Sequence, residues 1–538
     1  MTENVSLIVD ALRKTDNVLY QQIAGGGAWK SALTKRAARV GKYRRYERGD
    51  HDQNLTKQQR NLLNITADDS ELNESSSNYC GIVVDMMAAR IKVNEITSDS
   101  EEATAWITDT LERNSFVSKQ GEWHRGAIRD SESYILIDPS TAMWTSEPAF
   151  DGHSGIVAIF DEMTQLPIWA CKIWAISEPA DLSTDAEDLG EETSVKVVVY
   201  QRSQITYWKG TAGSETLSPD TVKEVKGMNI IKDAEGNDLN GYDWKFGLIP
   251  LAQEANKRDN YTPYGESEIR VVIPLQDIVN GTLYDMQMAS KLSAFKIYWS
   301  IGMEIDKDGI VPGSVVNMVL KDKSGNVVTM IDEDTARYMQ SVRVGEFGVT
   351  DMSQYTNQLD KLEREISQVS QTPVYGITSQ GNLSGEALKQ LESGLIGKIV
   401  RFQNENTGAL INLLKLTAEM QRQFQVNQDF LGKFADAVMK ILGLSAPKAP
   451  PSELGAISVN WKSPEIINVN DQITALSTLR RDNPGLWPDD LYRERIGGLL
   501  GMTSVQIKDE GDKAVMESRN SFDMLIGGGG ETPPVDRL

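Results

Sequence analysis

The sequence predicts an α+β fold that is mainly helical. Two long amphipathic helices joined by a short polar loop occupy residues 354–425, and a β-rich region begins at residue 131. A second strand-and-turn module, at residues 296–352, lies between two amphipathic helices. With 538 residues and 40% hydrophobic composition, the chain is long enough to build several domains around sizeable cores.

Charge and cysteine content exclude several classes of protein. The formal net charge is −22, whereas proteins that grip duplex DNA neutralise its phosphates with Lys and Arg, so this surface should on average repel DNA. Cys80 and Cys171 are too few for a disulfide framework. The sequence shows neither a basic-then-apolar signal segment nor an apolar run of membrane-spanning length. We therefore expect a soluble, cytoplasmic chain.

The first 48 residues are expected to be helical, and they carry a basic run with interleaved tyrosines. Its members are Lys35, Arg36, Arg39, Lys42, Arg44, Arg45 and Arg48, with Tyr43 and Tyr46 among them. Such a mixture is found in nucleic-acid-binding helices, but a solvated helix face, or a patch meeting acidic neighbours in an oligomer, is commoner in so acidic a chain. After a turn at 49–51, we expect a buried helix over 78–93 and another helix over 101–114.

The first strand-like run of the β-rich region is ESYILID, at residues 132–138. Further strand-like runs cover 155–160, 168–175, 195–201 and 204–209. The acidic segment at 179–193 is interpreted as a solvated loop rather than a cation site. Two segments resemble calcium loops only in composition. In the one at Asp233 the glycine falls at the wrong offset, and in the one at Glu304 the twelfth place is Val315, where a bidentate Glu belongs.

Two amphipathic helices flank the module at 296–352. The first is expected over 265–295, with Pro274 placed to start or kink it. Its apolar stripe is Leu275, Val279, Leu283 and Met286. The second follows the module, and its stripe is Tyr355, Leu359, Leu362, Ile366 and Val369, opposite a charged side. This arrangement predicts a stalk of two helices with the module at its tip.

The loop at 371–383 contains no charged residue. Pro373 interrupts the preceding helix, and Gly376 and Gly381 are residues that favour bends. Ser384 then provides an N-cap for a helix that reaches Gln425 and spans on the order of 60 Å. Considered alone, this segment is an ordinary helical hairpin.

The C-terminal part is expected to be mostly helical. A helix should continue to residue 444, followed by a proline-rich linker at 446–455 and a short strand at 456–461. Helices are expected at 470–479 and 491–500, and residues 526–538 read as a flexible tail.

The sequence contains no recognisable catalytic or metal-binding motif. The glycines at 25–27 lack the spacing of a phosphate-binding loop, and neither GxGxxG after a strand nor GxSxG occurs. His51, His124 and His153 are widely separated and form no pairing typical of metal ligands. We therefore predict no enzymatic activity, no catalytic residues, no cofactor and no metal site.

Five stretches, taken in order, resemble the portal proteins of tailed double-stranded DNA bacteriophages of the siphophage type. They are KYRRYERGDH (42–51), NYCGIVVDMMAARI (78–91), GESEI with IPLQDIVNGTLYDM (265–286), SAFKIYWSIGMEID (293–306) and QTPVYGITSQGNLSGEALKQLESGL (371–395). The last is the most specific. The segment GLWPDDLYRERIGGLLGMT (485–503) resembles the family's usual C-terminal ending more weakly.

The resemblance implies a mainly helical portal fold that assembles as a dodecameric ring around a central channel. It also implies a division into wing, stem, clip and crown regions. The implied regions are the N-terminal wing (1–264), the first stem helix (265–295), the clip (296–352), the second stem helix (353–370), the tunnel loop (371–383), the long wing helix and the helix after it (384–448), and the wing return, crown and flexible tail (449–538).

What the resemblance implies about function is a structural role. The ring would sit at one vertex of the capsid, nucleate procapsid assembly, and let double-stranded DNA pass without sequence preference during packaging and ejection. The implied partners are further copies of this chain, the terminase large subunit, the major capsid protein and scaffold, and the head-tail adaptor. The implied location is the virion, with the host cytoplasm during assembly and no membrane.

The resemblance also implies which residues meet DNA. The expected DNA-facing side chains of the tunnel loop are Thr372, Thr378, Ser379, Gln380 and Asn382, while Pro373, Gly376 and Gly381 are expected to set the loop's bend. Hydroxyl and amide groups make weak, sequence-blind contacts to phosphates, whereas each Lys or Arg contact would add salt-dependent grip. An uncharged loop in an acidic channel therefore suits a sliding polyanion.

Two other classes of protein remain open from the residues alone. A DNA-processing enzyme would need convergent acids that bind a divalent metal, and a metal-dependent nuclease assay tests for it. A monomeric helical adaptor would use the long amphipathic helices to bind a partner helix. Imaging that shows a ring with a central hole separates the portal reading from the adaptor.

Overall fold

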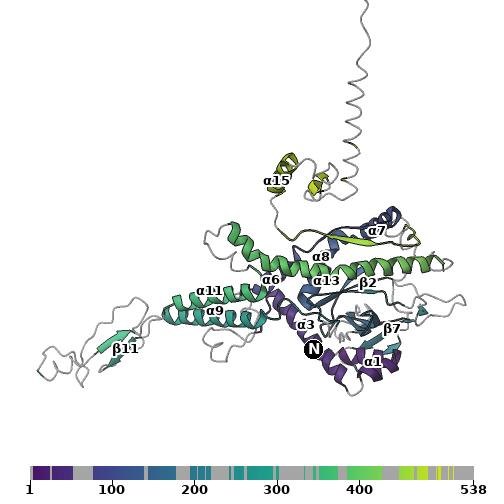
Figure 1. Ribbon diagram of the computed structural model, residues 1–538. Coiled ribbons are helices and arrows are strands. Elements are labelled where there is room, and N and C mark those ends of the chain that lie inside the picture. Colours follow the sequence, from purple (N-terminus) through teal and green to yellow (C-terminus); the bar gives the residue numbers. More distant parts are fainter. Residues whose placement is uncertain are drawn as a thin grey trace, which may run out of the picture. The chain divides into compact units, whose positions relative to one another are not determined.

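The computed structural model in Figure 1 describes most of the chain. The described residues are 4–24, 27–52, 77–138, 143–176, 194–202, 204–211, 214–219, 242–243, 248–259, 263–294, 298–301, 333, 343–346, 351–373, 385–426, 448–465, 469–482, 492–493, 495–497, 507 and 513. They combine α-helices with antiparallel strands, as the α+β prediction requires.

The chain divides into two compact units. The first unit comprises Met1–Gly41, Asp85–Ser267 and Ser393–Leu538, and the second comprises Lys42–Val84 and Glu268–Glu392. Each is described separately below.

The largest sheet among the described residues belongs to the first unit and is antiparallel, with strand order β4-β5-β6-β7-β8 and β9 also paired to β7. Its strands are β4 (Gly155–Phe160), β5 (Pro167–Ile176), β6 (Ser194–Gln201), β7 (Gln204–Thr211), β8 (Ser218–Pro219) and β9 (Tyr242–Asp243). Alternate residues of β6 belong to different cores, because successive side chains of a strand point to opposite faces. Val195, Val197 and Val199 pack in one core, while Val198 and Tyr200 pack in the other.

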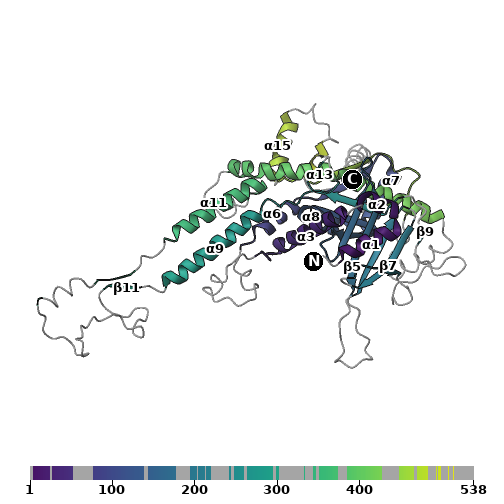
Figure 2. The ribbon, with the colours of Figure 1, turned by 90° about the horizontal axis from the view of Figure 1, so that it is seen from below.

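The N-terminal helices cover one face of this sheet. They are α1 (Val5–Thr15), α2 (Asn17–Ala24) and α3 (Ala28–Arg48), and Figure 2 shows α1 and α2 alongside β5 and β7. Leu7, Ile8 and Leu12 of α1 are fully buried in the same core as Trp169 of β5. The expectation of a helical N-terminus is confirmed.

A second layer of the first unit is a three-stranded sheet, counted over the described residues, with the order β10-β2-β3. Its strands are β2 (Glu132–Ile137), β3 (Trp144–Pro148) and β10 (Leu251–Ala255), and it is covered by α7 (Glu101–Arg113), α8 (Phe116–Asp130) and α13 (Gly385–Val426). Every residue of β2 is buried, so both faces of this central strand are covered. Figure 1 shows α13 running along this layer.

Segments far apart in the sequence meet in a third sheet, where β1 (Val93–Ser98) pairs antiparallel with β13 (Ile457–Trp461). The strand expected at 456–461 is therefore confirmed. The helix expected over 78–93 is shorter than predicted: α6 (Tyr79–Ala88) ends well before Val93, which already belongs to β1. The helix α15 (Val469–Asp482) confirms the one expected at 470–479.

The second unit contains a pair of long helices. They are α9 (Ile273–Ala294) and α11 (Ser353–Ser370), which lie side by side in Figure 2. The helix expected over 265–295 begins only at Ile273, with Pro274 in its first turn, where the missing N–H costs no intrahelical bond. Between these helices in the sequence, β11 (Tyr298–Ile301) pairs antiparallel with β12 (Arg343–Glu346).

The apolar stripe expected on α11 is fully buried only in its middle, and Tyr355 and Leu359 are half-buried. Leu362 and Ile366 are buried, but Val369 is 47% exposed, whereas Ser370 is 3% exposed. The buried positions are spaced by four, so the stripe continues to Ser370 rather than stepping back to Val369.

Several sequence expectations lie outside the described residues. They concern the acidic segment at 179–193, the calcium-like segments at Asp233 and Glu304, most of the module at 296–352, the helix continuing to residue 444 and the tail at 526–538.

Candidate functional site

The expected tunnel loop, residues 371–383, is described only as far as Pro373. Gly376, Thr378, Ser379, Gln380, Gly381 and Asn382 lie outside the described residues. The structure therefore defines where the loop begins, at the end of α11, and how the helices on either side of it are held.

The last turn of α11 is closed by a network of hydrogen bonds. Gln371 adopts the left-handed conformation, with φ 51° and ψ 34°, and its N–H donates to the Gln368 carbonyl at 3.3 Å. The N–H of Thr372 donates to the Ser367 carbonyl at 3.1 Å, and Ser367 Oγ donates to the Thr372 carbonyl at 2.6 Å. Because these bonds satisfy the end of the helix and Pro373 cannot continue it, the direction in which the loop leaves α11 is fixed.

The structure corrects the expectation for Thr372. Its side chain was expected to face DNA, but the residue is 1% exposed and its hydroxyl donates to the Ser370 carbonyl at 3.2 Å. The left-handed turn at Gln371 directs Thr372 inward, so it anchors the start of the loop. Pro373 is also buried, and its role in setting the bend remains a prediction.

Polar contacts hold α11 within the second unit in addition to its apolar stripe. Tyr79 Oη donates to the carboxylate of Glu363, and burial together with this carboxylate raises the pKa of Tyr79 above its ordinary value. Gln358 Nε2 donates to Thr282 Oγ1 of α9 at 3.2 Å. These bonds fix both the rotation of α11 about its axis and its position along that axis relative to its neighbours.

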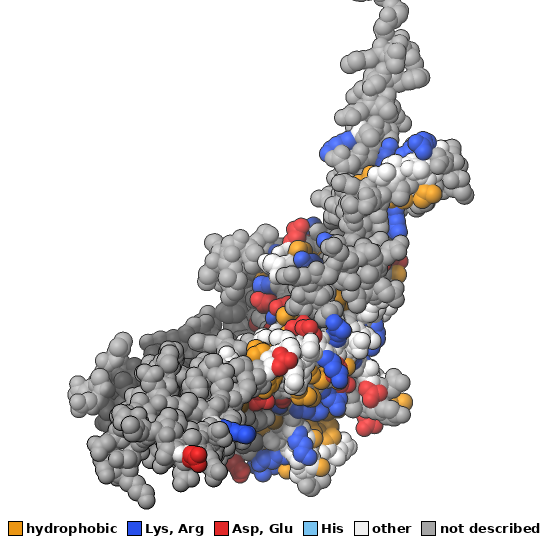
Figure 3. Space-filling model, turned by 90° about the vertical axis from the view of Figure 1, so that its left-hand side faces the viewer, with side chains coloured by type: hydrophobic (Ala, Val, Ile, Leu, Met, Phe, Trp, Pro, Cys, Tyr) orange, Lys and Arg blue, Asp and Glu red, His pale blue; other side chains and the backbone are white. Residues whose placement is uncertain are grey.

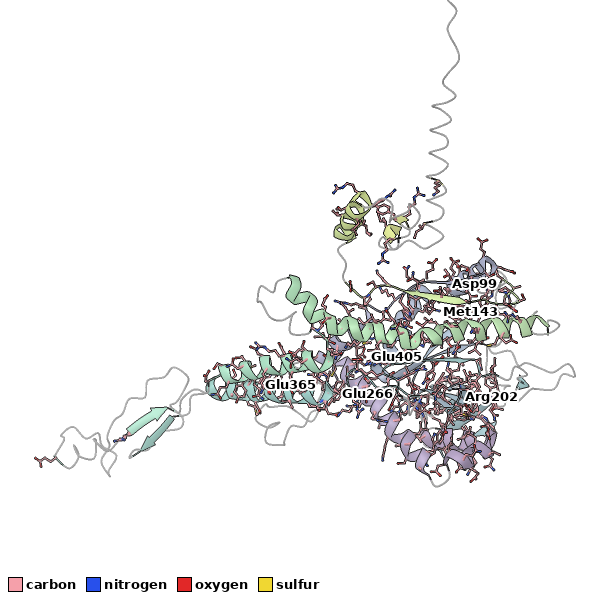
Figure 4. The ribbon with its side chains drawn as sticks, in the orientation of Figure 1. Asp99, Met143, Arg202, Glu266, Glu365 and Glu405 are labelled. Carbon is pink, nitrogen blue, oxygen red and sulfur yellow. The ribbon has the colours of Figure 1, made fainter. Side chains whose placement is uncertain are left out.

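The outer side of α11 carries charges of both signs. The predicted charged side comprises Asp360, Lys361, Glu363, Arg364 and Glu365. All are exposed except Glu363, which is half-buried, and Figure 4 labels Glu365 on this helix. On the face drawn in Figure 3, Lys and Arg side chains of the described residues are interspersed with Asp and Glu. Mixed charge of this kind attracts a polyanion less than a continuous basic stripe would.

The long helix α13 is seated on the sheet by an asparagine. Asn406, which is fully buried, accepts a hydrogen bond from the Ala255 N–H at 3.0 Å and donates one to the Ala255 carbonyl at 3.1 Å. The side-chain amide thus takes the place of a neighbouring strand at the end of β10. It fixes α13 both along its axis and in rotation.

Three indole N–H groups among the described residues extend this attachment of α13. Trp106 donates to Gln421 Oε1 at 2.9 Å, Trp144 to Thr417 Oγ1 at 3.0 Å, and Trp461 to Thr407 Oγ1 at 2.9 Å. The tryptophans come from α7, β3 and β13, so separate elements of the first unit are tied to one helix. A buried indole N–H needs such a partner, which makes each contact specific in register.

Three cations of the basic run near the N-terminus make internal contacts. Arg36 pairs with the fully buried Glu132 and lies over the ring of Tyr264, 3.6 Å from its centroid. In the second unit, Lys42 and Arg45 both pair with Asp52, at 3.0 and 2.8 Å. These three cations are therefore engaged within the chain, whereas Lys35, Arg39 and Arg48 of the same run are exposed.

Clusters of metal-ligating side chains would indicate a metal site in the described part of the structure. Among the described residues, no group of three or more His, Cys, Asp or Glu side chains could hold a metal ion. Cys80 and Cys171 are both buried free thiols, and burial raises the pKa of each. No helix within the described ranges has the length and apolar character of a membrane span.

The first unit also contains a cavity of ≈ 730 Å³. Its lining includes Arg202 and Glu405, both labelled in Figure 4, together with Arg258 and the apolar Leu454. Burial lowers the pKa of Arg258, against the opposing influence of the Glu254 and Glu405 carboxylates. The lining mixes cations, anions and aliphatic groups without the convergent set of polar groups that a cofactor site presents.

Sequence reasoning missed the buried polar residues that position the helices. Asn406 lies within the apolar stripe of α13, and Gln276 and Asn280 are buried on α9 at a spacing of four. Amides inside an otherwise apolar helical stripe were the available signal, since a buried amide requires specific partners. Their partners are distant in the sequence and could not be read from it.

Comparison with known proteins identifies the family. Residues 30–499 match the model of the family described as phage portal protein, SPP1 Gp6-like. No curated protein gives a match to the chain. The matched range includes α9, α11 and α13, the described start of the loop at 371–373, and all five stretches that suggested the resemblance. Because the match covers well over half of the sequence, the chain belongs to the phage portal protein family.

Proposed function

We propose that this chain assembles as a dodecameric ring at one vertex of a phage capsid and that double-stranded DNA passes through the central channel during packaging and ejection. The observation that carries the proposal is the match to the phage portal family over residues 30–499. The helices α9 and α11, which lie side by side, support the proposal as the candidates for the pair of stem helices.

The proposed regions follow the chain. The wing comprises residues 1–264, the stem 265–295 and 353–370, and the clip 296–352. The tunnel loop is 371–383, the long wing helix and the helix after it are 384–448, and the wing return, crown and tail are 449–538. The long helix α13 is hydrogen-bonded to α7 and β10, and this rigid attachment supports its assignment as the wing helix.

The proposed DNA contact is the uncharged part of the loop beyond Pro373. Thr378, Ser379, Gln380 and Asn382 remain the candidates, and Thr372 is withdrawn because it is buried. A sliding duplex must not be held, and each cationic contact to a phosphate would add salt-dependent affinity. Neutral hydroxyl and amide groups in a chain of net charge −22 satisfy that requirement.

The proposed partners match these regions. The clip docks the terminase large subunit and later the head-tail adaptor, while the wing contacts the major capsid protein and scaffold and nucleates procapsid assembly. The terminase supplies ATP hydrolysis, so the portal itself performs no catalysis. The proposed location is the portal vertex of the virion, after assembly in the host cytoplasm.

Native mass measurement and negative-stain imaging of the purified full-length chain test the ring. The proposal predicts closed rings with a central hole, and twelve copies per ring when the chain assembles together with capsid protein and scaffold. A monodisperse monomer that persists under those assembly conditions would contradict the proposal and favour a helical adaptor.

A further inference from the structure

A buried polar cluster in the second unit joins two segments of the chain, 46–51 and 77–79, to one face of α9. We call it the α9 clamp. Its members are Tyr46, His51, Ser77, Tyr79, Gln276, Asp277 and Asn280. His51 is 2% exposed, Gln276 0% and Asn280 2%, so their hydrogen bonds decide which protonation states fit.

The orientation of the Gln276 amide is fixed by two backbone groups. Its Oε1 accepts from the N–H of Tyr79 at 2.8 Å, and its Nε2 donates to the carbonyl of Ser77 at 2.6 Å. A backbone N–H can only donate and a carbonyl can only accept, so the reversed amide would lose both bonds. Nε2 of Gln276 is therefore the atom that faces Asn280.

The orientation of Asn280 follows from that of Gln276. Gln276 Nε2 donates to Asn280 Oδ1 at 3.0 Å, which leaves Asn280 Nδ2 directed at Nδ1 of His51, also at 3.0 Å. Since Nδ2 is a donor, Nδ1 of His51 must accept, and a protonated Nδ1 would place two donors face to face.

The other ring nitrogen of His51 completes the sequence of bonds. Nε2 lies 3.2 Å from the carbonyl of Tyr46, which only accepts, so Nε2 carries the proton. The orientation imposed at Ser77 and Tyr79 is thus transmitted through two amides to a single tautomer of one histidine.

We propose that the α9 clamp holds His51 as the neutral Nε2–H tautomer, and that protonating His51 breaks its bond to Asn280 and so weakens the attachment of residues 46–52 to α9, which the bond from Tyr46 to Asp277 still maintains. The device would make the attachment of α9, the proposed first stem helix, sensitive to acid. The hydrogen-bond geometry is independent of the proposed function, so a failure of either leaves the other intact.

Nearby charges act on His51 from several elements. Those that face the clamp are Asp50 and Asp52 beside His51, Lys42 and Arg45 on α3, Asp277 on α9, and Glu363 on α11 through Tyr79. Lys42 and Arg45 are both paired with Asp52. Asp277 accepts from Tyr46 Oη at 2.6 Å, and Tyr46 Oη accepts from the Asp52 N–H at 3.2 Å.

These influences oppose one another, and burial is the largest. Burial lowers the pKa of His51 below its ordinary value of 6.5. It outweighs the Tyr46 carbonyl, the charges of Asp277 and Asp50 and a hydrogen bond with the Asn78 side chain, all of which act to raise the pKa. The folded state therefore binds fewer protons at His51 than the unfolded state does. Its contribution to stability is fully present above pH 6.5 and is lost as the pH falls toward the folded-state pKa.

Magic-angle-spinning NMR of sedimented full-length protein, labelled with ¹⁵N only at histidine, observes the tautomer directly. The sequence has three histidines, and His51→Gln identifies the His51 signal by its loss. The proposal predicts one protonated nitrogen, Nε2, at neutral pH and a titration midpoint below 6.5. An Nδ1–H tautomer, a doubly protonated ring at neutral pH, or a midpoint at or above 6.5 would overturn it.

Asn280→Asp provides a second test, because it replaces the hydrogen-bond donor that faces Nδ1 of His51 by an acceptor. The new carboxylate still accepts from Gln276 Nε2, but it now presents an acceptor to Nδ1 of His51 and favours the charged ring. The midpoint of His51 should rise by about one pH unit or more. Asn357→Asp, which adds the same charge at an exposed position of α11, should leave the midpoint close to the wild-type value.

Equal shifts in the two variants would mean that general electrostatics, rather than the orientation of Asn280, sets the state of His51, and the proposal would fail. Should Asn280→Asp not fold, the wild-type tautomer and midpoint remain decisive. Thermal unfolding supplies a further check: acidification from about pH 7.5 to about pH 5.5 should lower the Tm of wild type more than that of His51→Gln.

Discussion

Asn406 and Ala255 form a two-way hydrogen-bonded pair in which the side-chain amide of α13 binds both the N–H and the carbonyl of the last residue of β10, at 3.0 and 3.1 Å. Asn406 is fully buried, as is Ala255. The pair stands where a further strand would otherwise be required, and it connects the proposed wing helix to the sheet beneath it.

Replacing Asn406 should be costly. Asn406→Leu keeps the side-chain volume but leaves two buried backbone groups of Ala255 without partners, at about 1–3 kcal/mol for each group. Denaturant unfolding should therefore show a midpoint well below that of wild type. The matched control is Asn404→Leu at an exposed position of the same helix, and an equally small effect of both substitutions would contradict the role given to Asn406.

The left-handed residue at the end of α11 should accept glycine with a gain in stability. Gln371 has φ 51°, a conformation that costs residues with a Cβ about 1–2 kcal/mol and that glycine adopts freely. Gln371→Gly should raise the free energy of unfolding by about 1 kcal/mol. The same exchange at Gln368, inside the helix and exposed, should lower it by about 1 kcal/mol, and a loss at both positions would argue against the cap.

Asp10 should make the first unit sensitive to acid. Burial opposes its ionisation, but hydrogen bonds from the Leu217 N–H, Lys14 and Arg13 outweigh burial and hold its pKa below 3.8. A depressed folded-state pKa contributes stability that is present above the unfolded-state value and is lost as the pH falls through the folded-state value.

Asp10→Asn should therefore reduce the free energy of unfolding at neutral pH by about 1–3 kcal/mol, because hydrogen bonds to a charged group are lost. The difference from wild type should shrink as the pH is lowered below 3.8. Urea titrations at a series of pH values measure this. Glu162→Gln, at an exposed position, serves as the control, and a difference that grows toward acid would refute the assignment.

The sequence was a good guide where a helix or strand pattern is continuous. The helix expected at 353–370 is observed as α11 (Ser353–Ser370), and the one starting after Ser384 as α13 (Gly385–Val426). The strand runs at 155–160 and 195–201 match β4 and β6 within one residue. Each has enough apolar residues at the proper period to determine its own structure.

Elements that depend on distant partners were missed. The helix α8 is buried through Gln120, His124 and Asp130 as well as apolar residues, so it lacks a clear stripe. His124 Nδ1 lies 2.9 Å from Glu254, 130 residues further along the chain. Such pairings are set by tertiary structure, and local propensity carries no information about them.

The expected site was predicted only in part, for a similar reason. Pattern alone located the end of α11 and the break at Pro373, because helix termination is a local property. The family resemblance implied that Thr372 is among the DNA-facing residues, whereas its side chain is buried directly after the left-handed turn at Gln371. A glycine at 371 would have predicted a left-handed turn at this helix end, whereas glutamine does not predict one.

The central claim, that an uncharged loop lets DNA slide through a portal channel, is tested most directly by the amount of DNA packaged per head. Phage particles made with Gln380→Lys combined with Asn382→Lys should contain about tenfold less nuclease-protected DNA, because every subunit would add salt-dependent phosphate contacts. The control, Gln21→Lys with Gln22→Lys on the exposed side of α2, should package normally, and both variants should form intact rings. Wild-type DNA content in heads built with the loop variant would contradict the account.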